Sequence, residues 1–413
     1  MNQPSENPHR SQVHVPHSTQ LEHAYAMIMS FLGWAERVKL ESYDWHDLWA
    51  TAYARHAKDL YFKNRAYGSS LVAPLFLVDL LFPNIRRHFV TPRTYPISHA
   101  QIGMGYLNLY SFTKDQRFLS KAKMLVEPLL KMASPRTSGL GWGMKHEWMT
   151  IAGLIPGDTA CNTQTAYPFE FFEQLFEATR QQEYLDYLNQ IAKHVSNDFH
   201  EWHDGERLAC SYSTIDSRKV VNANSYRMVM LLGAGIRFKN SDYLQKGMAT
   251  LRYVLSMQAP DGSWPYAEAE PFVDTYHTCF VLKNLHKVKP ACGPLTSMVD
   301  EALNRGLRFY FDRLFDNLGY PVPFAVKYRT VPYKYDSYDI AESIGLLADL
   351  GIEQERLLHL LHFARMRFQT SEGWFVFRRH DYWPFNGIPY MRHANSAMLL
   401  ALTKVLHLIN TSM

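Results

Sequence analysis

Turns built around glycine recur along this chain at nearly even spacing, and this repeat constrains the fold more than any other feature. Each turn places glycine beside an aromatic residue or an aspartate, and successive turns lie 64, 57, 57 and 54 residues apart. The turns are Gly141-Trp142, Asp204-Gly205, Asp261-Gly262-Ser263-Trp264, Gly319-Tyr320 and Gly373-Trp374. Between them, polar residues at Asp115, Gln182 and Ser241 each precede a new apolar pattern, as helix caps do. One repeat unit is therefore predicted to hold two helices and their loops.

Apolar residues recur every three or four positions through most of the chain, which is the period of helices with one buried face. Only two short period-2 runs, at 208–213 and 374–378, predict minor strands. Six or seven helical hairpins fit between residues 20 and 410. An open solenoid and a closed ring both bury such hairpins, but familiar helical solenoid repeats are only about 33 to 47 residues long. A period near 57 favours an all-α fold, an α/α toroid or (α/α)6 barrel with minor short strands.

Composition narrows the class of protein. The chain has 413 residues, 47% of them hydrophobic and 20% charged, which excludes global disorder. Residues 1–18 are predicted to be a disordered arm and residues 19–413 one toroid domain. The net charge is only +4 and no long basic run occurs, so nucleic acid is not an expected partner.

The cysteines and the N-terminus bear on cellular location. Four scattered cysteines form no CxxC pair, and we expect no metal and no cofactor. The polar N-terminus carries no apolar signal segment, and the longest apolar stretch, 71–82, is too short to span a bilayer. The expected location is cytoplasmic.

Aromatic residues make up 14% of the chain, and many stand beside polar residues in the predicted loops. The densest cluster comprises Trp264, Tyr266, Glu268, Asp274, Tyr276 and His277. Loops on a rigid scaffold often carry ligand groups, and aromatic rings can stack on sugars. The competing interpretation is a structural turn in which Asp274 caps the helix that starts near His277.

Four further clusters lie on other predicted loops. Tyr212, Asn222, Asn224 and Arg227 form the second, in which the asparagines also suit helix capping and Arg227 suits a uronate carboxylate. His146 and Glu147 form the third; they are adjacent in sequence, which disfavours a metal site. The fourth lies around Tyr335, and its alternative interpretation is a capped helix N-terminus. The last is a basic, aromatic rim near the C-terminus that includes Arg378, Arg392 and His393, and its alternative interpretation is a solvated surface loop.

Some of these motifs resemble a known family. Tyr43-Asp44, Ser211-Tyr-Ser…Asn222-Ala-Asn224 and the pair DGSWPY…DTYHT at 261–278 resemble the bacterial VpsJ-like proteins linked to exopolysaccharide and capsule biosynthesis. That resemblance covers roughly residues 40 to 290 and implies an α/α toroid. More distantly, the same pair resembles the catalytic toroid of D-glucuronyl C5-epimerases.

These resemblances and clusters together predict a carbohydrate-active protein of polysaccharide biosynthesis that acts on an acidic, uronate-containing glycan. Proton abstraction at C5, by an epimerase or a lyase, ranks above hydrolysis, because the sequence offers no clear carboxylate pair. The predicted catalytic residues are Tyr266, Tyr276, His277 and Tyr212. The predicted substrate-binding residues are Trp264, Glu268, Asp274, His146, Glu147, Asn222, Asn224, Arg227, Tyr335, Arg378 and Arg392. A non-catalytic glycan-binding or scaffold subunit of a synthesis complex remains the alternative.

Overall fold

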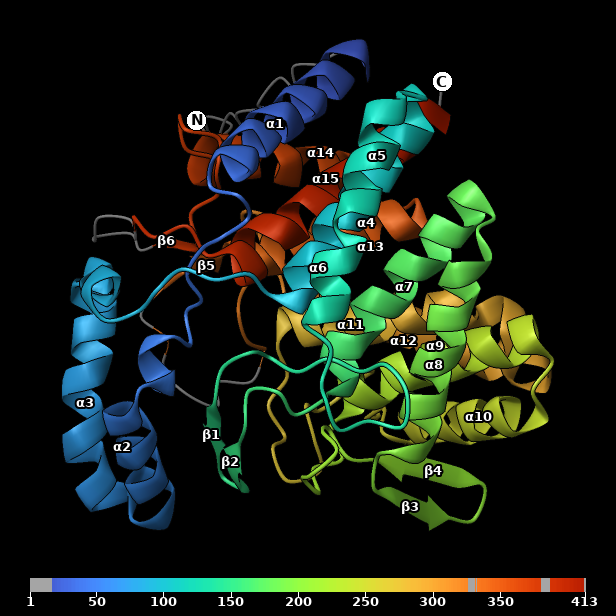
Figure 1. Cartoon of the computed structure of the whole chain (residues 1–413), viewed down its shortest axis with the longest axis horizontal. Coiled ribbons are helices and arrows are strands. Elements are labelled where there is room, and N and C mark those ends of the chain that lie inside the picture. The colour runs from blue at the N-terminus through green and yellow to red at the C-terminus, as the bar shows by residue number, and fades with distance from the viewer. Residues whose placement is uncertain (1–16, 326–330, 332, 380–386, 412–413) are drawn as a thin grey trace, which may run out of the picture.

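The computed structural model describes residues 17–325, 331, 333–379 and 387–411 and shows a ring of helical hairpins (Figure 1). The predicted arm falls almost wholly on residues 1–16, outside the described residues. Six inner helices form the wall of the barrel. They are α4 (Pro96–Thr113), α7 (Asn162–Thr179), α9 (Val221–Phe238), α11 (Thr275–Val288), α13 (Ser337–Leu350) and α15 (Ser396–Thr411). Each inner helix contacts the next, and α15 contacts α4. This closure confirms the toroid and excludes the open solenoid.

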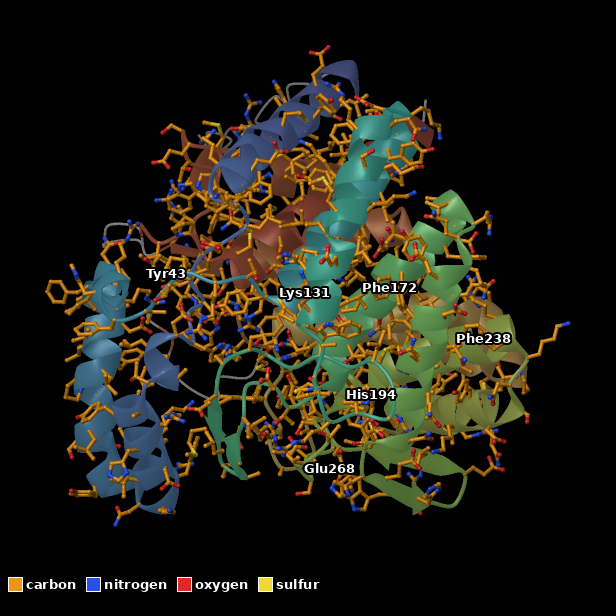
Figure 2. The ribbon with its side chains drawn as sticks, viewed as in Figure 1. Tyr43, Lys131, Phe172, His194, Phe238 and Glu268 are labelled. Atoms are coloured by element: carbon orange, nitrogen blue, oxygen red, sulfur yellow. The ribbon has the colours of Figure 1, made fainter. Side chains whose placement is uncertain are left out.

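Outer helices back the inner ring. They are α1 (His17–Arg37), α5 (Gln116–Met124) with α6 (Val126–Lys131), α8 (Gln182–Asn197), α10 (Ser241–Ser256), α12 (Thr296–Arg313) and α14 (Gln354–Phe363). The outer α8 buries one face, with Tyr184, Leu188 and Ile191 inward, whereas the inner α4 is buried over most of its length. Burial all round is typical of a helix enclosed by neighbours. Side chains fill the space between the layers, as Figure 2 shows around Phe172.

The seam of the ring joins the two ends of the chain. Ser396 donates to the side chain of Gln101 at 2.6 Å, and Asn108 donates to Thr403 at 3.1 Å. These contacts link α15 to α4 across almost 300 residues of sequence.

Connections at the two ends of the barrel differ in length. Inner helices pass to outer helices through tight turns, with left-handed residues such as Lys114, Arg180 and Gly351 at their ends. The return connections are long and contain the predicted glycine turns. Gly262 has φ +94°, a conformation that side chains rarely tolerate, and a Cβ on Gly141 would meet the His194 ring at 2.3 Å. All long loops therefore gather at the N-terminal ends of the inner helices.

The described loops contain three two-stranded antiparallel sheets: β1 (Trp148–Thr150) with β2 (Gly153–Ile155), β3 (Glu201–Asp204) with β4 (Arg207–Cys210), and β5 (Tyr335–Asp336) with β6 (Arg378–Arg379), of which the first two are hairpins. Strand β4 overlaps the predicted run at 208–213. The run at 374–378 touches a strand only at its last residue, and β1–β2 was not predicted.

One helix pair stands outside the repeat. The first loop contains α2 (Ala52–Lys63) and α3 (Arg65–Leu81), which pack mainly on each other and lie apart from the ring helices (Figure 1). The sequence repeat did not predict this pair, because no glycine turn marks it. Among the described residues, no helix combines the length and apolarity that crossing a lipid bilayer requires.

Candidate active site

Polar and aromatic side chains gather at the end of the barrel where the inner helices begin and the long loops lie, and we call this end the mouth. On one side, Asp274 caps α11: its Oδ1 accepts from the backbone N–H of His277 at 3.0 Å, and its Oδ2 lies 2.7 Å from His277 Nδ1. Asp274 is buried, whereas the side chain of His277 is 18% exposed. The aspartate fixes Nδ1, which leaves Nε2 as the nitrogen available to a ligand. The rings of Tyr266 and Tyr276 lie 4.7 and 4.1 Å from that of His277.

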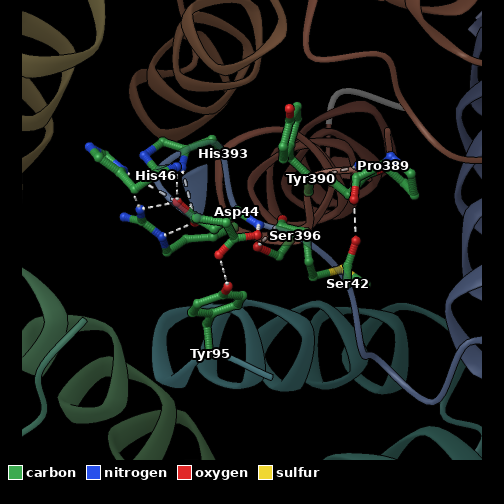
Figure 3. Close-up of polar contacts among 12 residues, drawn as sticks. Ser42, Asp44, His46, Tyr95, Pro389, Tyr390, His393 and Ser396 are labelled. Carbon is green, nitrogen blue, oxygen red and sulfur yellow. Dashed lines mark hydrogen bonds and ion pairs between the residues drawn. The ribbon is translucent and has the colours of Figure 1, made fainter. Parts of the chain in front are cut away.

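On the other side, a buried Asp44 gathers a cluster of cationic and imidazole groups (Figure 3). Arg392 holds both of its oxygens, with Nε to Oδ2 at 2.6 Å and Nη2 to Oδ1 at 2.9 Å. His46 Nδ1 lies 3.2 Å from Oδ1, and His393 Nδ1 lies 3.5 Å from Oδ2, the latter too long for a well-formed hydrogen bond. Arg392 and His393 belong to a π-helical turn, Met391–Asn395, a distortion often found at functional sites.

Burial controls the protonation of this second side. Burial opposes ionisation of Asp44, but Arg392 and His393 outweigh it and hold its pKa well below the ordinary value. Burial lowers the pKa of His46 to about 3 and that of His393 to about 4, although Asp44 pulls both upward. Both imidazoles are therefore neutral near pH 7.

A second carboxyl lies beneath Asp44. Asp47 accepts from the backbone N–H of Asp44 at 2.5 Å and from the hydroxyl of Tyr95 at 3.1 Å. Burial and the nearby charge of Asp44 raise the pKa of Asp47 to about 7. The mouth thus contains a group that titrates close to neutral pH.

Aromatic rings connect the two sides. Tyr276 lies 5.2 Å from Tyr338, and Tyr338 lies 5.4 Å from His393, so two tyrosine rings separate His277 from His393. Ring contacts continue beside Asp44, where the ring centroids of Trp45 and His46 lie 4.1 Å apart.

The wall extends from there through His146 to the loops before α9. His46 stacks on His146 at 5.2 Å, and Arg218 lies over Trp148 and Tyr212 at 4.8 and 4.9 Å. Both ring nitrogens of His146 are buried without a hydrogen-bond partner. Such a wall of rings suits the stacking of a sugar.

Most of the residues predicted to be catalytic lie in this mouth, but burial defines what they can do. Burial raises the pKa of Tyr212 and Tyr266 despite the nearby Arg218, so both phenols keep their protons near neutral pH. Tyrosines in this state donate hydrogen bonds rather than act as bases. Of the predicted binding residues, Asp274, His146, Arg378 and Arg392 also lie here. Arg378 donates to Asp336 at 2.8 Å and covers the ring of Trp45.

The other predicted binding residues have partners elsewhere. Asn224 ties β4 to α9 through both backbone groups of Cys210, and Arg227 is fully buried with Glu201 as its partner. Trp264 is buried in the core, where its indole N–H donates a hydrogen bond to the backbone oxygen of Val254 at 3.0 Å.

Four of the predicted binding residues remain. Tyr335 donates to Asp316, Glu147 pairs with Arg55, and Glu268 is exposed beside Lys219. Asn222 is buried near the mouth with an unpartnered Oδ1.

Sequence reasoning assigned no role to His46, Trp45 or Arg218, and it placed His393 only in a basic rim. The available signal was the polar stretch Asp44-Trp45-His46 directly after the first helix. Its meaning depends on ring closure, which brings Asp44 against residues 348 positions away.

Asp44, His46 and His393 are the group that the described residues offer for a metal ion, with ligand atoms within 4.8 Å of one another. Arg392 already supplies a positive charge to both oxygens of Asp44, and it contacts His46 Nδ1 at 3.1 Å. A second cation there would have to displace or repel this guanidinium. The donor set therefore fits an arginine-centred cluster better than a metal centre.

Comparisons with known proteins identify the fold through solved structures rather than through sequence. No protein-family model matches the sequence, and no curated protein sequence matches it. Solved structures match in shape. A cellobiose 2-epimerase from Bacillus thermoamylovorans superposes with a TM-score of 0.61 at 9% identity, covering 76% of this chain and 88% of that one.

Two more solved structures share the fold. A sugar epimerase from a ruminal bacterium gives a TM-score of 0.58 at 13% identity, covering 76% of this chain and 87% of that one. A polysaccharide lyase gives a TM-score of 0.54 at 12% identity, and the match covers 86% of this chain and 98% of that one. At these identities the likeness establishes the α/α-toroid fold.

Proposed function

We propose that this protein is a carbohydrate-active enzyme that inverts a sugar carbon next to a carbonyl by moving its proton. The observation that carries the proposal is the pair of imidazoles, His277 and His393, held apart by the Tyr276 and Tyr338 rings in one aromatic mouth. Inversion needs two acid/base groups on opposite faces of the carbon. The shared fold with sugar epimerases supports the same reaction class.

The two imidazoles are suited to different halves of the reaction. His393 is neutral because burial lowers its pKa to about 4, so it can accept the proton that leaves the carbon. His277 is hydrogen-bonded through Nδ1 to Asp274, which orients the ring so that Nε2 can exchange a proton with the opposite face of the carbon. The electron pair of the broken C–H bond moves onto the carbonyl oxygen and returns when the second proton arrives. In the reverse direction the two histidines exchange roles.

Neutral phenols can stabilise the intermediate. Burial raises the pKa of Tyr338 well above its ordinary value, so its hydroxyl remains a donor. Its ring lies between the two imidazoles, where negative charge would develop on the substrate oxygen. Fixed donors aimed at developing charge are a major source of rate acceleration.

Charge balance in the mouth favours a neutral sugar with a free reducing end. Arg392 is paired with Asp44, Arg378 with Asp336, and Arg218 with Asp216 at 3.0 Å. In the described part of the mouth these arginines thus carry no net excess charge for a substrate carboxylate. The reacting carbon would then be C2, next to the aldehyde of the open-chain sugar.

A uronate-containing glycan is the second candidate, and Arg218 is the observation that favours it. Its guanidinium lies over two rings beside the mouth and is of the planar kind suited to a carboxylate, so a uronate would compete with Asp216 for it. The proton would then leave C5, and loss of the O4 substituent would make the enzyme a lyase. A role in capsule or exopolysaccharide synthesis, with cytoplasmic synthesis machinery as partner, belongs to this candidate.

Deuterium exchange tests both candidates in one experiment. The protein is incubated in D₂O with cellobiose, with mannose and with glucuronate-containing oligosaccharides, and NMR locates the deuterium. Exchange at C2 supports the neutral reducing sugar, and exchange at C5 supports the uronate. Ultraviolet absorbance of a C4–C5 double bond then identifies lysis. A folded protein that exchanges neither position would overturn the proposal in favour of a glycan-binding subunit.

A further inference from the structure

The helix pair outside the ring exposes an apolar surface that none of the described residues covers. We call residues 52–89 the lateral hairpin; they comprise α2, α3, the 3-10 turn Pro83–His88 and Phe89. Helix α3 has eleven apolar residues among its seventeen, yet Gly68 is its one buried residue. The ring helix α4, of similar length, is buried over most of its residues. A helix this apolar is normally covered on at least one face.

This segment carries several exposed aromatic side chains. Among the described residues, all six exposed Phe and Tyr side chains belong to the lateral hairpin: Tyr53, Phe62, Tyr67, Phe76, Phe82 and Phe89. Phe82 and Phe89 are 62% and 69% exposed, and Leu77 beside Phe76 is 51% exposed. Large exposed aromatic groups concentrated in one segment indicate an interaction site rather than scattered exposure.

The same segment carries the positive charge of the protein. It contains six Lys or Arg residues and two Asp residues, a net charge of +4, which equals the net charge of the whole chain. Its acids are already paired, Asp59 with Lys63 and Asp79 with Arg86. Arg65 and Arg87 are exposed, and no described carboxylate lies within ion-pair distance of either.

We propose that the lateral hairpin docks the protein on the surface of an anionic lipid bilayer. Exposed Phe, Tyr and Leu side chains would enter the boundary between headgroups and acyl chains, and the basic residues would contact the anionic headgroups. A second copy of this chain is a poorer occupant, because a symmetric contact would bring the exposed Arg65 and Arg87 of two copies together. The ring would remain outside the bilayer, held beside it by α2 and α3.

Vesicle sedimentation tests this surface. The full chain is mixed with phosphatidylcholine vesicles and with vesicles that also contain phosphatidylserine, and we expect binding to the second kind that weakens with salt. The double variant Phe76→Glu/Leu77→Glu should weaken binding by about 100-fold or more, since it removes two apolar anchors. Arg65→Glu/Arg87→Glu should weaken it by about 30-fold or more.

Matched controls separate the surface from general effects. Met298→Glu changes an exposed apolar residue on α12, and Arg136→Glu/Lys239→Glu reverses two exposed charges elsewhere. Both should bind as the unaltered chain does, and circular dichroism checks that every variant folds. Absence of binding, or equal binding to both kinds of vesicle, overturns the proposal. So does self-association that Phe76→Glu/Leu77→Glu abolishes without any vesicle binding, which would assign the surface to a second copy.

Discussion

The two sides of the mouth hold the same pair of groups, an aspartate and an imidazole, in different surroundings. Asp274 is stabilised by the backbone N–H of His277, in the first turn of α11, and by the His277 ring. Asp44 is stabilised by the buried guanidinium of Arg392, which takes both carboxylate oxygens. The first aspartate is therefore free to act on its histidine, whereas the second is largely committed to its arginine.

This difference teaches how one fold can place a proton donor and a proton acceptor in the same site. On the first side, the Asp274 carboxylate orients the His277 ring through Nδ1. A histidine beside an aspartate that an arginine has neutralised experiences mainly burial, and its pKa falls to about 4, as for His393. Pairs of groups whose environments separate their proton affinities are typical of acid/base catalysis.

The largest expected effect is on the proton-transfer step itself. His277→Gln keeps the shape and a hydrogen bond to Asp274 but removes the titratable group, so proton exchange should fall by about 10² to 10⁴-fold. The measurement is deuterium incorporation into the substrate in D₂O. His286→Gln, on the same helix α11 but at its far end, is the matched control. Equal loss in both variants would show that α11 had been damaged rather than that His277 acts in the reaction.

Removal of the carboxylate on the other side should act first on stability. Asp44→Ala leaves Arg392 buried and unpaired, which should reduce the free energy of unfolding by about 3 to 5 kcal/mol. Urea unfolding measures it. Asp300→Ala breaks an exposed pair with Lys289 and should cost about 1 kcal/mol or less. If Asp44→Ala/Arg392→Met is no more stable than Asp44→Ala, the unpaired arginine is not the cause.

Acid should destabilise the second side through its buried histidines. The pKa of His393 is about 4 in the folded chain and near 6.5 in the unfolded chain. Between these two pH values, the unfolded chain therefore binds more protons than the folded chain. The free energy of unfolding should therefore fall by about 1.4 kcal/mol per pH unit for this histidine as the pH drops from about 6.5 to about 4. Unfolding curves across this range check it. His393→Gln should show a shallower slope; an unchanged slope would contradict the assignment.

The smallest expected effect concerns the ring between the two sides. Tyr338→Phe keeps the aromatic wall and removes one neutral donor, so exchange should slow by about 10-fold with little change in stability. Kinetics and thermal unfolding measure the two quantities separately. Tyr187→Phe, on the outer helix α8, serves as the control. Loss of stability without loss of rate would make Tyr338 part of the packing only.

The order of the helices followed from the sequence because its signals are local. Glycines with positive φ, such as Gly262, and polar caps such as Asp115 act on their own turns, so their spacing gives the length of one hairpin. The same reasoning did not predict the lateral hairpin. Helix α3 contains Pro74, Asp79 and an almost unbroken apolar run, which has no clear helical period.

The chain by itself determined a repeat of helical hairpins, long loops at one end, and polar and aromatic groups within those loops. Tertiary structure alone decided which of these groups meet. Arg227, predicted to face a substrate, turns to Glu201, whereas Asp44 and His46 join His393 because α15 closes the ring against α4. The physical reason is that a loop residue's neighbours, burial and proton affinity depend on contacts across hundreds of residues, which no local pattern encodes.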